Sequence, residues 1–115
     1  MPARKPDVDP QSFFALDLRV GRVVSVREFE KARVPAYRLR VDFGPSVGVL
    51  ETSAQVTRYP ASELEGRSVV AVINIGRKMI AGLASEFLLL GALDPDGTVR
   101  LLRPEDESPP GAPVA

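Results

Sequence analysis

A chain of 115 residues, with 44% hydrophobic and 26% charged residues and a formal net charge of zero, has the composition of one globular domain and not of a disordered or fibrous protein. It contains neither cysteine nor histidine, which excludes disulfides and thiolate nucleophiles and removes the commonest zinc ligands and general bases. We therefore expect a protein that is not an enzyme, with no catalytic residues, no metal site and no cofactor.

The distribution of apolar and charged residues limits where the protein acts. No stretch approaches the roughly 18 to 20 uninterrupted apolar residues of a membrane span, and the N-terminal MPARKPDVDP lacks the apolar core of a secretory signal. We expect a cytoplasmic protein without membrane insertion. Residues 19–78 contain eleven basic and six acidic residues. This excess suits either phosphate contacts or an ordinary solvated surface.

The N-terminal region contains a helix-start signal. Asp9 is a capping residue, and Pro10 is tolerated at the first helical position, so residues 11–16 are predicted to form a short helical turn. The turn would expose Phe13, Phe14 and Leu16, too many large apolar groups for an isolated turn. We expect these three residues to pack on the body of the domain or on another subunit.

The next regions are typical of β-strands. Valine dominates residues 19–29 (RVGRVVSVREF), where Gly21 indicates a bulge or a sharp bend. After a turn at residues 44–48, residues 49–53 are expected to return as a third strand. The second strand, residues 37–43, alternates strictly between two faces: Tyr37, Leu39, Val41 and Phe43 on one, and Arg38, Arg40 and Asp42 on the other.

The second half predicts shorter elements. Short helical turns fit on either side of Pro60, with a weak cap at Ser62. Residues 67–75 and 86–90 are predicted strands, and a turn at 94–97 leads to a short strand at 99–102. The pattern is all-β, with five main strands, a helical connection after the third and no βαβ repeat. It favours a five-stranded OB-fold barrel with short helical segments. An SH3-like barrel or a small sandwich is the structural alternative.

Several sequence blocks resemble a known family. The run FFALDLRVGRVVSV resembles the opening of the tRNA-binding domain, found in free-standing dimeric proteins and appended to methionyl- and phenylalanyl-tRNA synthetases. The runs ARVPAYRLRVDFGPSVG, TSAQVT, VVAVINI and IAGLASEFLLLG are similar to the CsaA branch, which comprises secretion-related chaperones. These blocks extend from about residue 13 to residue 110.

The resemblance implies a single domain over residues 1–115, with a core at about 13–103. It also implies a homodimer formed through extensions at 1–18 and 104–115, in which Phe13, Phe14 and Leu16 belong to the interface. The implied partners are unfolded export precursors, tRNA and the export translocase. The proline- and charge-rich tail is expected to be disordered by itself, or to order as an arm against a partner subunit.

The resemblance also assigns binding residues. Asn74 either contacts the ligand or satisfies a turn, and Arg77 and Lys78 form a basic loop. Ser85 and Glu86 either contact the ligand or support a loop. Arg38 and Arg40 are added because alternation directs them away from the core. The full set of predicted peptide- or tRNA-binding residues is Arg38, Arg40, Thr52, Ser53, Gln55, Asn74, Arg77, Lys78, Ser85 and Glu86.

Two departures from the family bear on the ligand. Leu50 and Glu51 stand where the CsaA branch often has lysines, and Phe87 replaces a methionine typical of tRNA-binding relatives. Fewer positive charges predict weaker phosphate binding. Our leading hypothesis, based on the CsaA-like blocks and the surplus apolar residues near the N-terminus, is a CsaA-like homodimeric export chaperone for extended, partly apolar polypeptide. The alternative is an accessory protein that recognises tRNA by its shape and backbone.

Overall fold

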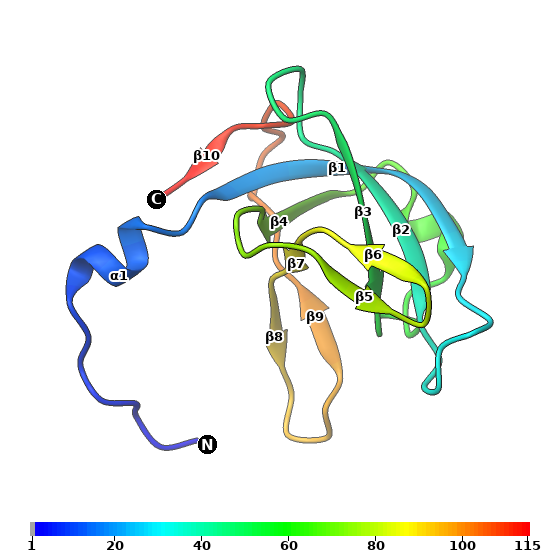
Figure 1. The fold of residues 1–115 in the computed structure, drawn as a ribbon, viewed down its shortest axis with the longest axis horizontal. Helices are drawn as coiled ribbons and strands as arrows, with labels where there is room; N and C mark the ends of the chain where they lie inside the picture. Colours follow the sequence, from blue (N-terminus) through cyan, green and yellow to red (C-terminus); the bar gives the residue numbers. More distant parts are fainter. Residues whose placement is uncertain (1) are drawn as a thin grey trace.

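The computed structural model describes residues 2–115. Its longest strand is β1 (Leu18–Glu28), and the other strands are arranged around it (Figure 1). The main sheet is antiparallel, with the order β3-β2-β1-β4-β7. It is formed with β2 (Tyr37–Asp42), β3 (Val49–Ala54), β4 (Ser68–Val72) and β7 (Leu88–Leu89). The sheet curls, so that the segment before β7 meets β3, where the Glu86 N–H donates to the Glu51 carbonyl at 2.9 Å. The result is a nearly closed OB-like barrel, which confirms the predicted fold class over the alternatives.

Close contact between β1 and β2 depends on a glycine. Because Gly21 has no Cβ, it fits against the second strand: a Cβ there would lie 2.5 Å from Val41 Cγ1 and 2.7 Å from the Phe43 ring. The bulge that was expected at Gly21 lies further along β1, where the register shifts between Val23 and Ser25. Gly21 therefore serves close packing, and the prediction of a bulge at this residue is corrected.

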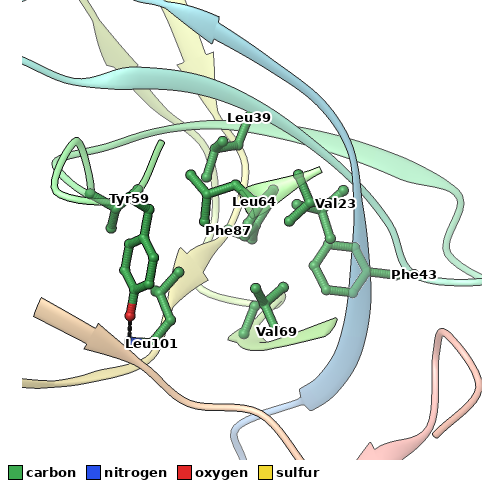
Figure 2. Packing of buried hydrophobic residues seen from close by; sticks show 11 residues of the cluster. Val23, Leu39, Phe43, Tyr59, Leu64, Val69, Phe87 and Leu101 are labelled. Carbon is green, nitrogen blue, oxygen red and sulfur yellow. Dashed lines mark hydrogen bonds between the residues drawn. The ribbon is translucent and has the colours of Figure 1, made fainter. Parts of the chain in front are cut away.

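The barrel interior contains Leu39, Val41 and Phe43, as the strand alternation predicted, together with residues of the other strands and of the α2 region (Figure 2). Leu39 and Val41 are 0% exposed, and the Phe43 ring meets the Phe87 ring edge-on at a centroid distance of 5.1 Å. Phe87 thus packs in the core. The Tyr59 hydroxyl accepts a hydrogen bond from the Leu101 N–H at 3.0 Å, which satisfies the one polar atom that this ring carries into the interior.

The helices are short. Asp9 caps α1 (Pro10–Phe14), as predicted, by accepting from the Gln11 N–H at 2.9 Å. This helix projects from the barrel in Figure 1. The second helix, α2 (Ala61–Leu64), begins directly after Pro60, so Ser62 lies inside it and is not its cap. Within residues 2–115, no helix is long and apolar enough to cross a membrane.

Two hairpins lie after β4. The first pairs β5 (Lys78–Ile80) with β6 (Leu83–Ser85) across a tight turn, in a region predicted as a loop. The second pairs β8 (Gly91–Leu93) with β9 (Val99–Leu101) and projects below the barrel in Figure 1. The predicted strand at 86–90 is reduced to β7, since the Glu86 N–H pairs with β3 and the second hairpin begins at Gly91.

The C-terminal tail is ordered on its own chain. Its strand β10 (Pro113–Val114) pairs with the start of β1, and the Gly111 N–H donates to the Val20 carbonyl at 2.7 Å. The backbones of Gly44 and Gly111 pass so closely that a Cβ on either would lie 2.5 Å from a carbonyl oxygen of the other segment. Dimerisation through residues 1–18 and 104–115 stays a prediction. Residue 1 lies outside the described part of the chain.

Candidate functional site

A groove of about 470 Å³ opens between the end of β3 and the β5–β6 hairpin. It reaches into the side of the barrel, where its lining includes the core residues Val56, Phe87 and Leu101. Ile75 and Leu88 are 52% and 53% exposed. The apolar residues that line the groove are Ala54, Val56, Ile75, Ile80, Phe87, Leu88, Leu89, Val99 and Leu101.

A pair of hydroxyl groups fixes the polar side of this groove. The side chain of Thr52 is turned inward by the alternation of β3, and the residue is 2% exposed. Its hydroxyl donates to the Phe87 carbonyl at 3.1 Å, so the Ser85 hydroxyl, at 2.7 Å, is left to donate to it. These bonds connect β3 to the segment that begins with β6. They support the shape of the groove and leave the Ser85 oxygen as an acceptor.

Five of the predicted binding residues meet in the groove. They are Thr52, Ser53, Gln55, Lys78 and Ser85, which come from the TSAQ block and from the two strands of the first hairpin. Lys78 lies in β5 directly across from Ser85, so the expected basic loop is partly a strand. Arg77, its exposed neighbour, does not line the groove. The structure therefore brings together sequence blocks that are more than twenty residues apart.

The side chain of Asn74 is hydrogen-bonded to the backbone near α1. Its side-chain oxygen accepts from the Asp17 N–H at 2.7 Å, and its amide nitrogen donates to the Ala15 carbonyl at 2.9 Å. Both polar groups thus hold the segment that connects α1 to β1. Glu86 is half-buried, and its backbone N–H closes the barrel against β3. Ligand contact by either side chain stays a prediction.

Arg38 and Arg40 lie beside the groove on the outer face of β2. Arg38 donates to Glu51 Oε1 through two nitrogens, at 2.9 and 3.2 Å. A depression of about 320 Å³ lies over this face. It is lined by Ser25, Arg27, Arg38, Arg40 and Glu51.

Most of the apolar lining and one of the arginines were not predicted from the sequence. Arg27 was overlooked because it belongs to β1, but the register places it directly across from Arg38. Ile75 and Leu88 were interpreted as strand interior. Ile75 keeps the alternation of Ala71 and Ile73 but lies beyond the end of β4, whereas Leu88 directly follows the buried Phe87, so alternation directs it outward. A hydrophobic residue predicted to face outward from a strand was the available signal.

The site as a whole combines a wide apolar surface with a few hydrogen-bonding groups and basic residues at the edges. Such a combination is typical of binding sites for partly apolar ligands. Among residues 2–115 there is no group of three or more acidic residues arranged to hold a metal ion.

Comparison with known families agrees with the sequence resemblance. A family model described as "Putative tRNA binding domain" matches residues 18–113. The chain belongs to this family. Within it, the likeness to the CsaA branch is confirmed by solved structures. The CsaA chaperone of Bacillus anthracis str. Ames is 43% identical, with a TM-score of 0.90, and the match covers 96% of this chain and 100% of that one. The CsaA chaperone protein of Picrophilus torridus is 39% identical, with a TM-score of 0.90, and the match covers 95% and 100%.

The same domain also occurs within larger proteins. The methionine–tRNA ligase of Porphyromonas gingivalis (strain ATCC 33277) is 33% identical over 108 residues, which are 94% of this chain but 16% of the ligase. That of Methanothrix thermoacetophila is 38% identical over 107 residues, or 93% of this chain and 15% of the ligase. This chain therefore spans about one sixth of the curated relatives that it matches.

Proposed function

We propose that this protein is a CsaA-like chaperone that binds extended, partly apolar segments of unfolded polypeptide in the groove. The observation that carries the proposal is the apolar lining itself, which leaves Ile75 and Leu88 half-exposed at the rim of a folded barrel. A concave apolar surface with a few polar groups at its edge is the usual form of a binding site. The ligand would place one or two apolar side chains in the groove and its backbone near Ser53, Gln55 and Lys78.

The proposal includes a homodimer. Phe13, Phe14 and Leu16 are exposed on and just after α1, which carries no buried residue. The two phenylalanine rings contact each other edge-on at 5.7 Å, so together they form one apolar surface that a second copy would cover. Sedimentation of the wild type and of Phe13→Ser/Phe14→Ser tests this part: the wild type should sediment as a dimer and the variant as a monomer. A monomeric wild type at micromolar concentration would contradict it.

The binding function is tested by suppression of aggregation. Purified protein should slow the light scattering of a denatured export precursor diluted from urea, and Ile75→Ser should lose most of this effect. Val49→Ser is the matched control, since Val49 is a half-exposed aliphatic residue at the start of β3 that does not line the groove. Equal activity of the two variants, or no activity in the wild type, would refute the proposal.

In this role the protein would act in the cytoplasm, without catalysing a reaction, and would hold precursors until the export translocase accepts them. Co-sedimentation of the protein with precursor-bound translocase tests the last step. We expect a ternary complex that Ile75→Ser does not form. If the translocase binds the protein equally well without a precursor, delivery through the groove is wrong.

The second candidate function is tRNA binding, favoured by the family match and by the arginines of β2. Arg38, Arg40, Arg77 and Lys78 would contact the phosphate backbone. Because each phosphate contact releases counterions, the affinity for tRNA should fall steeply with salt. A dissociation constant that hardly changes between low and moderate salt would speak against this function.

A further inference from the structure

The outer face of β1 and β2 carries arginine side chains that do not contribute to the stability of the barrel. Arg27 and Arg38 are directly opposite each other in the β1–β2 ladder. Like charges in such a pair destabilise a sheet. Glu51 offsets this through its contact with Arg38, but within residues 2–115 neither Arg27 nor Arg40 has an ion-pair partner. Two guanidinium groups are therefore available to a ligand in the depression above this face.

This face continues directly into the groove. Ser53, which lines the groove, is directly opposite Arg38 in the β2–β3 ladder, and Arg40 is two pairs further along, opposite Glu51. Directly opposed residues in a ladder have Cβ atoms about 5 Å apart, and an extended chain advances about 3.3 Å per residue. An extended ligand with one side chain in the groove would thus reach the arginines with a residue two to four positions away.

We propose that the groove and the arginines form one bipartite site, which prefers polypeptides with acidic residues two to four positions from an apolar anchor. The inference rests on the proposed function. Peptide carboxylates match the arginines because a guanidinium binds a carboxylate through two parallel hydrogen bonds. Lys78, on the other side of the groove, adds a third positive charge at its rim. Glu51 is already held by Arg38, so it does not oppose an acidic ligand at Arg27 and Arg40.

A polypeptide fits this face better than RNA does. Single-stranded RNA is held by stacking of bases on aromatic side chains, and the exposed aromatic residues of the described chain are Phe13 and Phe14, on α1 and away from β2. Two free arginines also provide few phosphate contacts for a duplex. A short acidic segment beside an apolar anchor, in contrast, needs only two cationic partners.

The test uses three fluorescein-labelled twelve-residue peptides with the same central Leu-Val-Leu-Val segment. The residues two to four positions beyond this segment are Asp in the first peptide, Asn in the second and Lys in the third. In fluorescence anisotropy with the wild-type protein at low salt, the Asp peptide should bind about tenfold more tightly than the Asn peptide, and the Lys peptide most weakly. In a longer peptide with the same apolar segment, Asp residues placed seven to nine positions beyond it should give no preference over Asn.

Variants assign the preference to the arginines. Arg27→Gln/Arg40→Gln should reduce the difference between the Asp and Asn peptides to about twofold or less. Arg103→Gln is the matched control, because Arg103 is exposed beside the acidic residues of the tail and lines neither the groove nor the depression. The control should keep the full preference. Circular dichroism of the variants shows whether the barrel is intact.

The outcomes separate the two proposals. If all three peptides bind equally and Leu88→Ser weakens all of them, the bipartite site is wrong while the proposed function stands. If no peptide binds, the proposed function fails and the bipartite site fails with it. If a tRNA transcript binds in a manner that depends on Arg27 and Arg40, and the Asp peptide shows no preference, the face serves RNA and the inference is overturned.

Discussion

The barrel wall and the groove use the same kinds of apolar residue in opposite ways. In β1, β2 and β4, strands of five or more residues are paired on both edges, and their inward side chains are buried. Around the groove, only β3 is a long strand; β5, β6 and β7 have two or three residues, and residues such as Ile75 and Leu88 remain half-exposed. Long ladders therefore give this protein its stability, whereas short, interrupted strands leave apolar surface free for a ligand.

The largest effect is expected from the barrel wall. Phe43→Ala removes a fully buried ring that packs against Phe87 and should lower the free energy of unfolding by about 3 to 5 kcal/mol. Urea denaturation measures this loss. Val24→Ala, at a half-exposed position of β1, is the control and should change stability by less than about 0.5 kcal/mol. Similar losses for the two variants would mean that the wall does not dominate stability.

The contact between the tail and the barrel should show the next largest effect. Gly44 has a φ of +86°, and an added Cβ would lie 2.5 Å from the Pro110 carbonyl oxygen, so Gly44→Ala should cost about 2 to 3 kcal/mol and release the tail. Gly48 has a similar φ of +89° but open space around it. Gly48→Ala should therefore cost only about 1 kcal/mol. Limited proteolysis within residues 103–112 should accelerate in Gly44→Ala and not in the control.

A groove substitution should separate binding from stability. Leu88→Ser removes a half-exposed side chain, so the free energy of unfolding should change by less than about 1 kcal/mol, while the affinity for an apolar peptide falls about tenfold. Val49→Ser, outside the groove, should leave the affinity unchanged. A large loss of stability in Leu88→Ser would show that the groove belongs to the core, and the comparison between the two regions would not hold.

The turn of the first hairpin offers a smaller, stabilising change. Ala81 has a φ of +49°, which is unfavourable for alanine but common for asparagine, as the tight turn with Gly82 requires positive φ at both positions. Ala81→Asn should raise the free energy of unfolding by about 0.5 kcal/mol. Ala92→Asn, in an extended strand, should not stabilise the protein. Thermal unfolding of both variants checks the prediction.

The smallest effect concerns the turn of the second hairpin. The Thr98 N–H donates to Asp96 Oδ1 at 2.9 Å and lowers the pKa of this carboxyl below its ordinary value of 3.8. The folded pKa is thus below the unfolded one, so the ionised group stabilises the turn above pH 3.8, and this contribution is lost as the pH falls through the folded pKa. NMR titration should give a lower midpoint for Asp96 than for a peptide aspartate. The stability difference between the wild type and Asp96→Ala should shrink in acid.

Much of the fold was accessible from sequence because its signals are local. The alternation at residues 37–43 placed Leu39 and Val41 inside and Arg38 outside, and the capping signal at Asp9 located α1. The β5–β6 hairpin was missed because its strands are three residues long and too short to show a period. The bulge was misplaced because Gly21 serves close packing, which depends on Val41 and Phe43 in another strand.

The sequence by itself determined the barrel, since strand periodicity, turn residues and family blocks all depend on neighbours along the chain. Only the tertiary structure decided the site. It joined the TSAQ block to Ser85, committed both polar groups of Asn74 to the backbone near α1, and brought Arg27 opposite Arg38. The physical reason is that a binding surface consists of contacts between strands. Their register and closure arise from packing of the whole chain, and no single segment encodes them.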